Sequence, residues 1–498
     1  MFVRRWGLSA VGVNGCKAAH TASKGDAMTT IDTSVPTEPG GSDPAGEGAK
    51  GLRPNVLGIG GAIVMAVAGS APAYTIAAST ASLTAAVAFA GPAALLWCGI
   101  PMVGIAWAFA YLGRGETNAG ASYAWVRRAI HPVIGYLCGW SLIVAGLVFM
   151  VTGSLPAGAV TIGLFSTHLA TNTALVTVVG SIWFLVMAVM VFLGVRITAD
   201  AQWIMSTVEI AILLLFAILC LVHAQHAAVT PFRWSWFSPT AFHGTAGFAA
   251  GALVAMFYYW GWDVASNLSE ETQNSRRNPG LGGIVAVFIV FALYEIFTIA
   301  TQLTLTSKTI SANAADVLTV LGRDAWPGVG GKLLAVAVML STIATLETTI
   351  IQVTRSLFAM GRDRTLPPSL ARIHPRWRTP WVACLVSGIV SLILFALSNY
   401  VGSVGNILSD TISAIGLQIA FYYGFAALAV PIAYRHRLFH SAKELFFAGI
   451  LPLVSAGFMF YVFVKSIPGL NNPSLEMGLG LLGFGLIPLA IAWSRGSS

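Results

Sequence analysis

Residues 257–267 read Phe257-Tyr258-Tyr259-Trp260-Gly261-Trp262-Asp263-Val264-Ala265-Ser266-Asn267, an aromatic-rich run that contains a glycine and a carboxylate within an apolar segment. Placing an Asp side chain near the centre of a membrane helix costs about 2.5–3.5 kcal/mol, so we interpret Asp263 as a functional residue. The alternative is a carboxylate that hydrogen-bonds a neighbouring helix or lies at the cytoplasmic interface. Gly261 lets the backbone leave helical geometry, which a membrane tolerates only inside protein or beside a cavity. The stretch therefore predicts a broken helix at a binding site.

The composition around this stretch is that of an all-α polytopic membrane protein. Of 498 residues, 56% are hydrophobic and only 9% are charged, whereas a soluble domain has about 25% charged residues. A spanning helix needs roughly 20 mostly apolar residues. Twelve such spans are predicted, at about 55–82, 85–112, 132–165, 174–194, 197–223, 246–269, 280–305, 330–360, 380–399, 405–434, 445–466 and 476–494.

The basic residues predict the orientation of the spans. All but five of the 27 Lys and Arg residues fall on one side, and cytoplasmic loops carry the excess of such residues. Both termini should therefore be cytoplasmic, in a plasma (bacterial inner) membrane. The net charge of +8 is explained by topology, and we expect no nucleic-acid partner. The five residues on the other side are Arg233, Lys308, Arg323, Lys332 and Lys465.

Several segments lie outside the predicted spans. Residues 1–52 are poor in apolar residues and are predicted to be a disordered cytoplasmic tail. Met28 is an alternative start, which would remove residues 1–27. The segment 120–130 places Tyr123 and Trp125 beside two arginines, as an interfacial segment would. The five cysteines read as packing residues, and we expect no metal site and no cofactor.

The first span is interrupted in the same way as the sixth. Gly69 and Pro72 lie within it, and proline lacks an N–H group and clashes with the carbonyl one turn back. The alternative is a proline kink in a packed helix. Interrupted segments at corresponding positions of two halves point to the binding site of a transporter built from inverted repeats. With five spans per half, the first and sixth spans run in opposite directions, as an inverted repeat requires.

Several motifs resemble those of the amino acid–polyamine–organocation permease family, of the bacterial amino acid permease type. The resemblance covers residues 53–434 and continues more weakly to the end. The motifs are Asn118-Ala-Gly-Ala-Ser-Tyr-Ala-Trp-Val-Arg-Arg128, Gly135-Tyr-Leu-Cys-Gly-Trp140, Trp260-Gly-Trp-Asp263, Glu270-Glu271-Thr272, Arg277-Asn-Pro-Gly280, Arg355-Ser-Leu-Phe-Ala-Met-Gly-Arg-Asp363 and Leu366-Pro367.

The resemblance implies a LeuT-like core of five plus five inverted helices followed by two peripheral helices. The first repeat would span residues 53–225, the second 242–434, and the peripheral helices 440–498. It implies secondary active transport of amino acids by alternating access, coupled to protons or Na⁺. A polyamine or organic-amine transporter, or a nutrient sensor without turnover, is the alternative. No motif of a membrane-embedded enzyme is present, so we expect no enzymatic activity.

The resemblance also implies where the substrate binds. Backbone N–H groups at the first break would hold a substrate carboxylate, and the sixth span would supply an aromatic gate and an acid. Pro72 removes one of these donors, and Ala71 and Ala73 crowd the backbone, which favours a substrate dominated by its amine. For Tyr258 and Tyr259, the alternative to a role in substrate binding is that their rings serve only in packing. The predicted substrate-binding residues are Gly69, Ser70, Ala71, Pro72, Ala73, Tyr74, Phe257, Trp260, Gly261, Trp262 and Asp263.

Carboxylates in the spans are the candidates for ion coupling. Glu209 stands where many family members have a lysine, and a buried acid can load and release a proton near working pH. Glu209, Asp263 and Glu347 are therefore the predicted proton or sodium residues. Glu295 and Asp410 lie outside the motifs and are expected to be structural. An excess of buried acids suits a path for cations or cationic amines.

Overall fold

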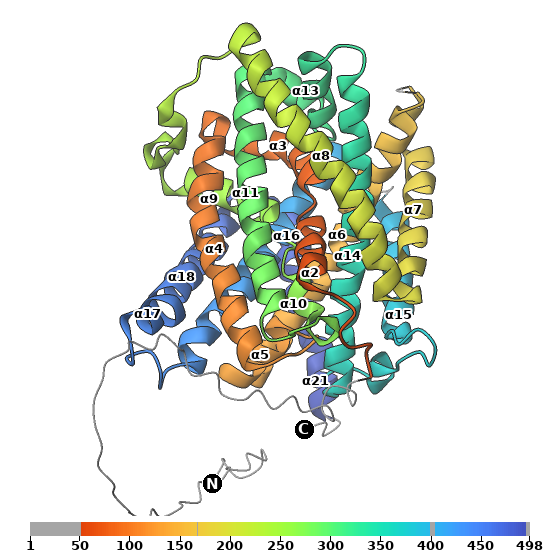
Figure 1. Cartoon of the computed structure of the whole chain (residues 1–498), viewed down its shortest axis with the longest axis vertical. Coiled ribbons are helices and arrows are strands. Elements are labelled where there is room, and N and C mark those ends of the chain that lie inside the picture. The colour runs from red at the N-terminus through yellow and green to blue at the C-terminus, as the bar shows by residue number, and fades with distance from the viewer. Residues whose placement is uncertain (1–50, 167, 399–403, 495–498) are drawn as a thin grey trace, which may run out of the picture.

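The computed structural model describes residues 51–166, 168–398 and 404–494, all but a few of them in helices or short connections (Figure 1). The only β-type pairing in this part of the chain is an isolated bridge between Leu57 and Thr272. The predicted tail lies outside the described residues up to residue 50. Leu52 is buried and packs against Ala119 and Phe358.

The helices up to residue 267 begin with two short pieces of one interrupted span. Their bounds are α2 Ile59–Ser70, α3 Pro72–Val87, α4 Gly91–Gly115, α5 Ser122–Ala129, α6 Pro132–Gly163, α7 Thr173–Leu193, α8 Val195–Ala227, α9 Gly244–Tyr258 and α10 Val264–Asn267.

The later helices include two connecting helices, α12 and α13, that the hydropathy pattern did not predict. The bounds are α11 Asn278–Thr304, α12 Ser307–Ala312, α13 Val317–Ala325, α14 Gly330–Arg362, α15 Trp381–Ser398, α16 Val404–Ala433, α17 Ala442–Glu444, α18 Leu451–Ser466, α19 Asn472–Leu475, α20 Leu481–Phe484 and α21 Leu486–Ser494. Single π-helical turns, Leu445–Ile450 and Glu476–Gly480, interrupt the last two spans.

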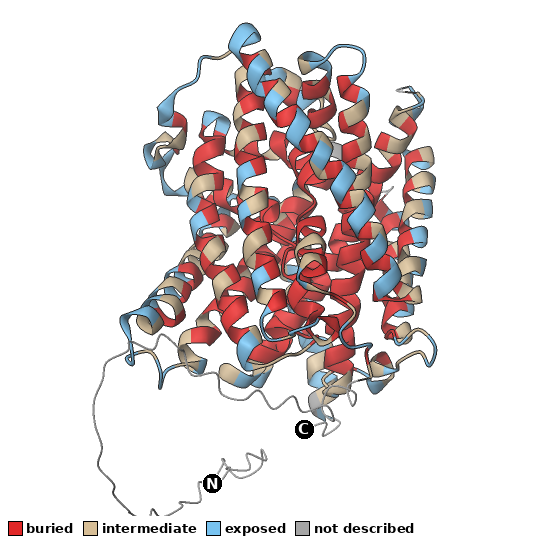
Figure 2. Cartoon of the chain, in the orientation of Figure 1, coloured by how far each residue is buried: buried red, intermediate tan, exposed pale blue. Residues whose placement is uncertain are grey.

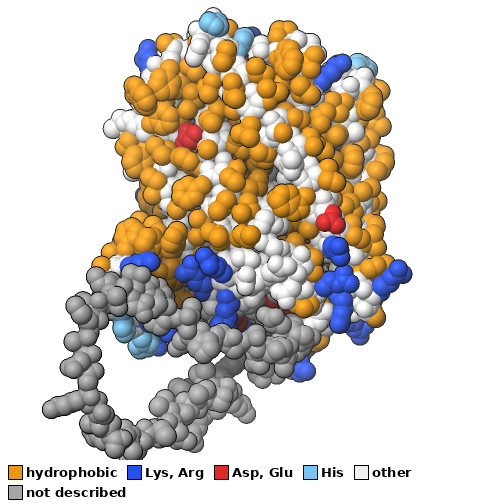
Figure 3. All heavy atoms as spheres, in the orientation of Figure 1, with side chains coloured by type: hydrophobic (Ala, Val, Ile, Leu, Met, Phe, Trp, Pro, Cys, Tyr) orange, Lys and Arg blue, Asp and Glu red, His pale blue; other side chains and the backbone are white. Residues whose placement is uncertain are grey.

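Ten helical stretches in the described part of the chain are long and apolar enough to cross a membrane. The first of them, Ile59–Gly115, is 57 residues long and comprises α2, α3 and α4. The apolar helix α9 is shorter than the other candidates. Hydrophobic side chains cover the middle of the face shown in Figure 3, whereas Lys and Arg gather mainly at the lower end. The molecule is therefore an integral membrane protein. We call this lower end, where α5 lies (Figure 1), the α5 end.

The core lies around α2, α10 and α14, where Figure 2 shows buried residues concentrated. In the most apolar window of α14, 83% of the residues are buried, against 28% in α7. Helix α14 packs against α6 and α8, and α11 packs against α2 and α4. The outer helices α7, α8 and α15 expose aliphatic side chains such as Ile204, Ile218 and Ile393, as lipid-facing helices do.

The first span is interrupted at Ala71, between α2 and α3. Ala71 has a φ of 47° and a ψ of 65°, the left-handed conformation, and its N–H group bonds back to the carbonyls of Val67 and Ala68. A non-glycine residue in this conformation costs roughly 1–2 kcal/mol. Pro72 then starts α3, a position where its missing N–H group costs no helical hydrogen bond.

The sixth span is interrupted over residues 259–263, between α9 and α10. Gly261 has a φ of +98°, a conformation that side-chain-bearing residues rarely adopt. The predicted break is thus present, and it lies directly against the first one. A Cβ atom on Gly69 would lie 2.2 Å from the Gly261 carbonyl oxygen, and one on Gly261 would lie 2.1 Å from the Gly69 carbonyl oxygen. Only two glycines allow the two backbones to cross this closely.

Three of the family motifs, 118–128, 270–272 and 355–363, meet at the α5 end, where their charged residues pair. Arg355 donates two hydrogen bonds to Glu271, at 3.0 and 3.1 Å, and both side chains are buried. Arg362 likewise binds Glu270 with two hydrogen bonds, at 3.0 and 3.1 Å. A third pair joins α5 to the end of α14. This third pair consists of Arg127 and Asp363.

Helix α5 forms within the predicted segment, but its aromatic residues do not face the membrane interface, so that expectation was wrong. Tyr123 and Trp125 are buried. The Tyr123 hydroxyl donates to Asp363 at 3.1 Å, and the Trp125 indole donates to the Glu116 carbonyl at 2.9 Å. Burial, with the Asp363 charge beside it, raises the pKa of Tyr123, so the phenol stays a neutral donor.

We predict that Gly261→Ala destabilises the protein and abolishes substrate binding. The new Cβ would overlap the Gly69 carbonyl, and the strained φ alone costs roughly 1–3 kcal/mol. Gly388→Ala in α15 is the control, because nothing lies within 4 Å of a Cβ there. Thermal unfolding in detergent and binding of labelled substrate measure the difference. Equal behaviour of the two variants would contradict the close backbone crossing.

We predict that Arg355→Met is strongly destabilising, because it leaves the Glu271 carboxylate buried and unpaired. Loss of one partner of a buried pair costs about 3–5 kcal/mol. Removing the second charge as well, in Arg355→Met/Glu271→Met, should recover most of the lost melting temperature. The exposed Arg372→Met serves as control. If Arg355→Met were as stable as Arg372→Met, the Arg355–Glu271 pair would have to be accessible to water, which would contradict the prediction.

Candidate functional site

The two breaks leave backbone carbonyls that receive no hydrogen bond from a helical N–H group. Hydroxyl groups of side chains on other helices donate hydrogen bonds to these carbonyls instead. The Thr345 hydroxyl of α14 donates to the Gly69 carbonyl at 3.1 Å. The Tyr294 hydroxyl of α11 and the Thr75 hydroxyl donate to the Ser70 carbonyl at 2.7 and 3.0 Å. These contacts hold the end of α2 in place without a continuous helix.

Glu209 of α8 lies at the N-terminus of α3. Its Oε1 accepts a hydrogen bond from the Ala73 N–H group at 3.0 Å, and the next N–H group, that of Tyr74, donates to the Ser341 hydroxyl at 3.2 Å. A carboxylate is stabilised at a helix N-terminus by the unpaired N–H groups and the helix dipole. Glu209 is fully buried, and its Oε2 has no hydrogen-bond partner in the described part of the chain.

An aromatic wall lies beside this point. The Tyr74 and Phe149 rings meet edge to face at 5.7 Å, and Phe149 contacts Trp260 at 5.6 Å and Phe257 at 6.2 Å. All four side chains are buried. The structure thus brings Tyr74 of the first break together with Phe257 and Trp260 of the sixth. Sequence reasoning missed Phe149 of α6, because neither a helix breaker nor a charge marks its position.

Asp263 points to a different helix, α16. Its Oδ2 accepts from the Tyr422 hydroxyl at 3.0 Å, and that hydroxyl accepts from the Trp260 indole N–H at 2.7 Å. The other carboxylate oxygen, Oδ1, is buried and has no hydrogen-bond partner among the described residues. Asp263 is therefore joined to the aromatic wall through Tyr422. The adjacent pair Tyr422-Tyr423 in an apolar span was the available signal for this contact.

Trp262 does not join the aromatic wall. Its ring packs against Phe109 at 5.1 Å and Tyr423 at 5.5 Å, and it lies over Gly283. Tyr258 and Tyr259 also lie elsewhere. Their hydroxyls bond Thr80 at 3.1 Å and the Leu95 carbonyl at 3.0 Å, the packing role left open for them.

Glu347 faces the α8–α14 interface, which also contains Glu209. Its Oε2 accepts from the Gln202 side-chain amide at 2.6 Å, and that amide also donates to the Ala344 carbonyl at 2.8 Å. Gln202, Ser206 and Glu209 follow one another at helical spacing and are buried on one face of α8. A buried polar seam therefore runs along this interface, with Gln202 as a member that was not predicted.

The remaining intramembrane acids lie apart from these groups. Asp410 accepts from the Asn471 side chain at 2.7 Å and ties α16 to the connection before α19. Glu295 of α11 is buried, and neither of its oxygens has a hydrogen-bond partner among the described residues.

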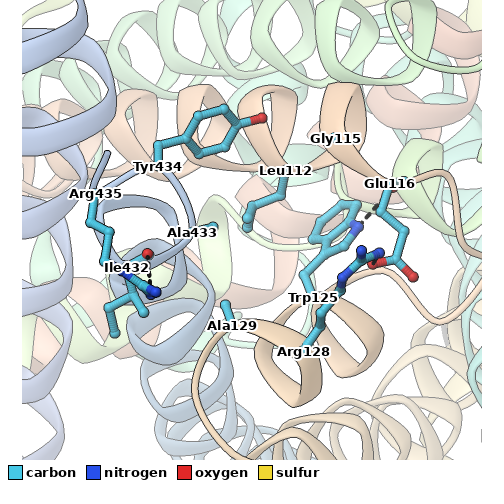
Figure 4. A pocket seen from close by; sticks show the side chains of 10 residues that line it. All are labelled: Leu112, Gly115, Glu116, Trp125, Arg128, Ala129, Ile432, Ala433, Tyr434 and Arg435. Atoms are coloured by element: carbon cyan, nitrogen blue, oxygen red, sulfur yellow. Dashed lines mark hydrogen bonds and ion pairs between the residues drawn. The ribbon is translucent and has the colours of Figure 1, made fainter. Parts of the chain in front are cut away.

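A cavity of about 370 Å³ lies at the α5 end, away from the predicted residues (Figure 4). Side chains of α4, α5 and α16 line it. Arg128 pairs with Glu116 at 3.3 Å on one side, and Arg435 bonds the Ile432 carbonyl on the other. It contains none of the predicted substrate-binding residues. The candidate site is therefore the tightly packed region between the two breaks.

The comparisons with known proteins identify the family of the chain. The family model described as "Amino acid permease" matches residues 58–486. The Methylthioribose transporter of Bacillus subtilis (strain 168) is 27% identical over 78% of this chain and 84% of its own length. The Low-affinity putrescine importer PlaP of Escherichia coli (strain K12) is 24% identical over 80% of this chain and 85% of its own.

A third relative is the Branched-chain amino acid permease BcaP of B. subtilis, 27% identical over 56% of this chain and 61% of its own length. The three relatives carry chemically different solutes, so similarity to them defines the class of protein and not its substrate. The family match over most of the chain, together with these relatives, shows that the chain is a transporter and belongs to the amino acid permease family.

Proposed function

We propose that this transporter imports amino acids by alternating access and couples their movement to protons. The substrate would lie between the two breaks, against the aromatic wall. The Glu209–Ala73 hydrogen bond carries the proposal, because it joins a titratable group to the N–H group that would otherwise hold a substrate carboxylate.

The coupling follows from competition for the Ala73 N–H group. Ionised Glu209 is favoured there by the helix dipole, and protonation removes that advantage. A proton arriving on Glu209 therefore weakens its bond and frees the N–H group for the substrate carboxylate. Proton and amino acid would then bind together. Glu347 and Gln202 extend the polar seam along α8 and α14, and this seam would lead the proton between Glu209 and the α5 end.

The amine end of the substrate would face the aromatic wall and Asp263. A cation over an aromatic face gains about 0.5–2 kcal/mol, and the free Oδ1 of Asp263 can accept from an ammonium group. The carbonyls of Gly69 and Ser70 already have partners, so fewer backbone acceptors remain for an ammonium or Na⁺.

The architecture that suits this cycle has twelve spans in two inverted repeats of five. The long stretch Ile59–Gly115 would supply two of them, and α9 with α10 another. The repeats would comprise residues 53–225 and 242–434, with two peripheral helices over 440–498. The basic α5 end in Figure 3 would be cytoplasmic and would carry both termini, in the plasma membrane.

A second candidate is transport of an amine that has no carboxylate, such as a polyamine. Pro72 has no N–H group, and the N–H group of Ala73 already donates to Glu209. Neither backbone position is then free to donate a hydrogen bond to a substrate carboxylate. Such a substrate would leave Glu209 in place during the whole cycle.

Uptake into proteoliposomes tests the proposal. A labelled panel of neutral, acidic and basic amino acids and diamines is offered with and without an inward proton or sodium gradient. We expect selective uptake of zwitterionic amino acids that the proton gradient stimulates. Uptake of diamines alone would establish the second candidate, and no net flux of any solute would favour a sensor.

We predict that Glu209→Gln abolishes stimulation of uptake by the proton gradient, because an amide cannot load a proton and, like the protonated acid, lacks the charge that favours the bond to the Ala73 N–H group. Exchange of labelled for unlabelled substrate without a gradient should persist. Glu295→Gln is the matched control, since it removes another buried acid outside the site. Unchanged stimulation in Glu209→Gln would refute the coupling role.

A further inference from the structure

A second cavity at the α5 end, of about 340 Å³, is lined by three arginines from three separate segments. Arg53 precedes α2, Arg196 lies in the first turn of α8, and Arg376 belongs to the connection between α14 and α15. The predicted substrate site includes none of its lining residues.

The positive charge of this cavity is not compensated within the described residues. Glu271 is the one acid that lines it, and both of its oxygens are bound by Arg355. None of the three arginines forms an ion pair within 4.0 Å in the part of the chain that the structure describes, including with Asp200 one turn along α8. Like charges gathered around one cavity repel each other, and a bound anion would relieve that repulsion.

The N-terminus of α8 adds to the positive potential of the cavity. Gly194, with a φ of +121°, precedes the helix, and a Cβ there would lie 3.4 Å from the Trp377 carbonyl. No side chain caps this end, and its first turn contains no acidic residue, although the helix is 33 residues long. The unpaired N–H groups of such a terminus attract anions, phosphate groups in particular.

The cavity borders both water and lipid. Its three arginines are exposed at the α5 end, where Figure 3 shows basic side chains gathered. Leu193 and Ile197 line it as well, and Ile197 is 45% exposed on the outer helix α8. A phosphate group could therefore arrive from the membrane surface or from solution.

We propose that this cavity binds a phosphate group, carried by an anionic phospholipid or by a soluble phosphate. Arginine forks bind phosphate oxygens in pairs, which suits three guanidinium groups around one anion. The segment of Arg53 is already fastened to the sixth span, because the N–H groups of Val56 and Leu57 donate to the Glu271 carbonyl at 2.8 and 3.1 Å. The anion would join this segment to α8 and to the α14–α15 connection, and so hold these three segments together.

The test measures ligand binding to the purified full-length protein in neutral detergent. Thermal unfolding is followed during titration with phosphatidylglycerol, with phosphatidylcholine as the uncharged control, and with inorganic phosphate at constant ionic strength against chloride. Native mass spectrometry counts lipid adducts. The variant is Arg196→Ala/Arg376→Ala, and the matched control is Arg276→Ala, which removes an exposed arginine at the same end outside the cavity.

We expect phosphatidylglycerol or phosphate to raise the melting temperature of the wild type and of Arg276→Ala, and the double variant to need at least about tenfold more ligand. A response to phosphatidylglycerol alone identifies a lipid site, and a response to phosphate as well identifies a soluble anion. Without ligand and at low salt, the double variant should melt at or above the wild type, because repulsion is removed.

Two results would overturn the proposal. One is a wild type that responds to neither ligand beyond its control. The other is a double variant that responds as the wild type does. If the double variant does not fold, Arg53→Ala replaces it, since this residue precedes the first helix and lines the same cavity.

Discussion

The backbone contact between Gly69 and Gly261 is the constraint on which the rest of the structure depends. Two helices interrupted in the membrane leave N–H and C=O groups that lipid cannot satisfy. Bringing the two interruptions together confines these groups to one buried place, and a Cβ atom at either glycine would prevent it. The site therefore exists because two glycines let two backbones cross.

The polar groups freed by the breaks determine which side chains the surrounding helices must supply. Thr345 and Tyr294 donate hydrogen bonds to carbonyls of α2. Glu209 and Ser341 accept hydrogen bonds from N–H groups of α3. Carbonyls thus meet hydroxyl donors and N–H groups meet acceptors. Of these partners Glu209 is the one carboxylic acid, which is why we propose it as the coupling residue.

Much of the fold could be predicted from sequence because membrane spans and helix breakers act locally. Pro72 and Gly261 mark the breaks where they occur, and the ends of α14 follow the apolar run closely. The contacts of the site are not local. Phe149 resembles any other aromatic residue in a span, and only the packing of α6 brings it to Tyr74.

Tertiary packing also explains the wrong expectation for α5. Tyr123 and Trp125 beside arginines are typical of a membrane interface, but here Asp363 and the Glu116 carbonyl bind them inside the protein. The contacts of the charged residue Glu209 could not be predicted from sequence for the same reason. Its position in an apolar span indicated function, yet its bond to Ala73 required the α3 N-terminus to lie opposite.

An experimental structure with a transported substrate bound at low pH tests the central claim most directly. The account predicts the substrate beside Tyr74, Phe149 and Trp260, with its carboxylate on the Ala73 N–H group and the Glu209 side chain displaced from it. A substrate elsewhere, or one bound between the breaks while Glu209 still accepts from Ala73, would contradict it.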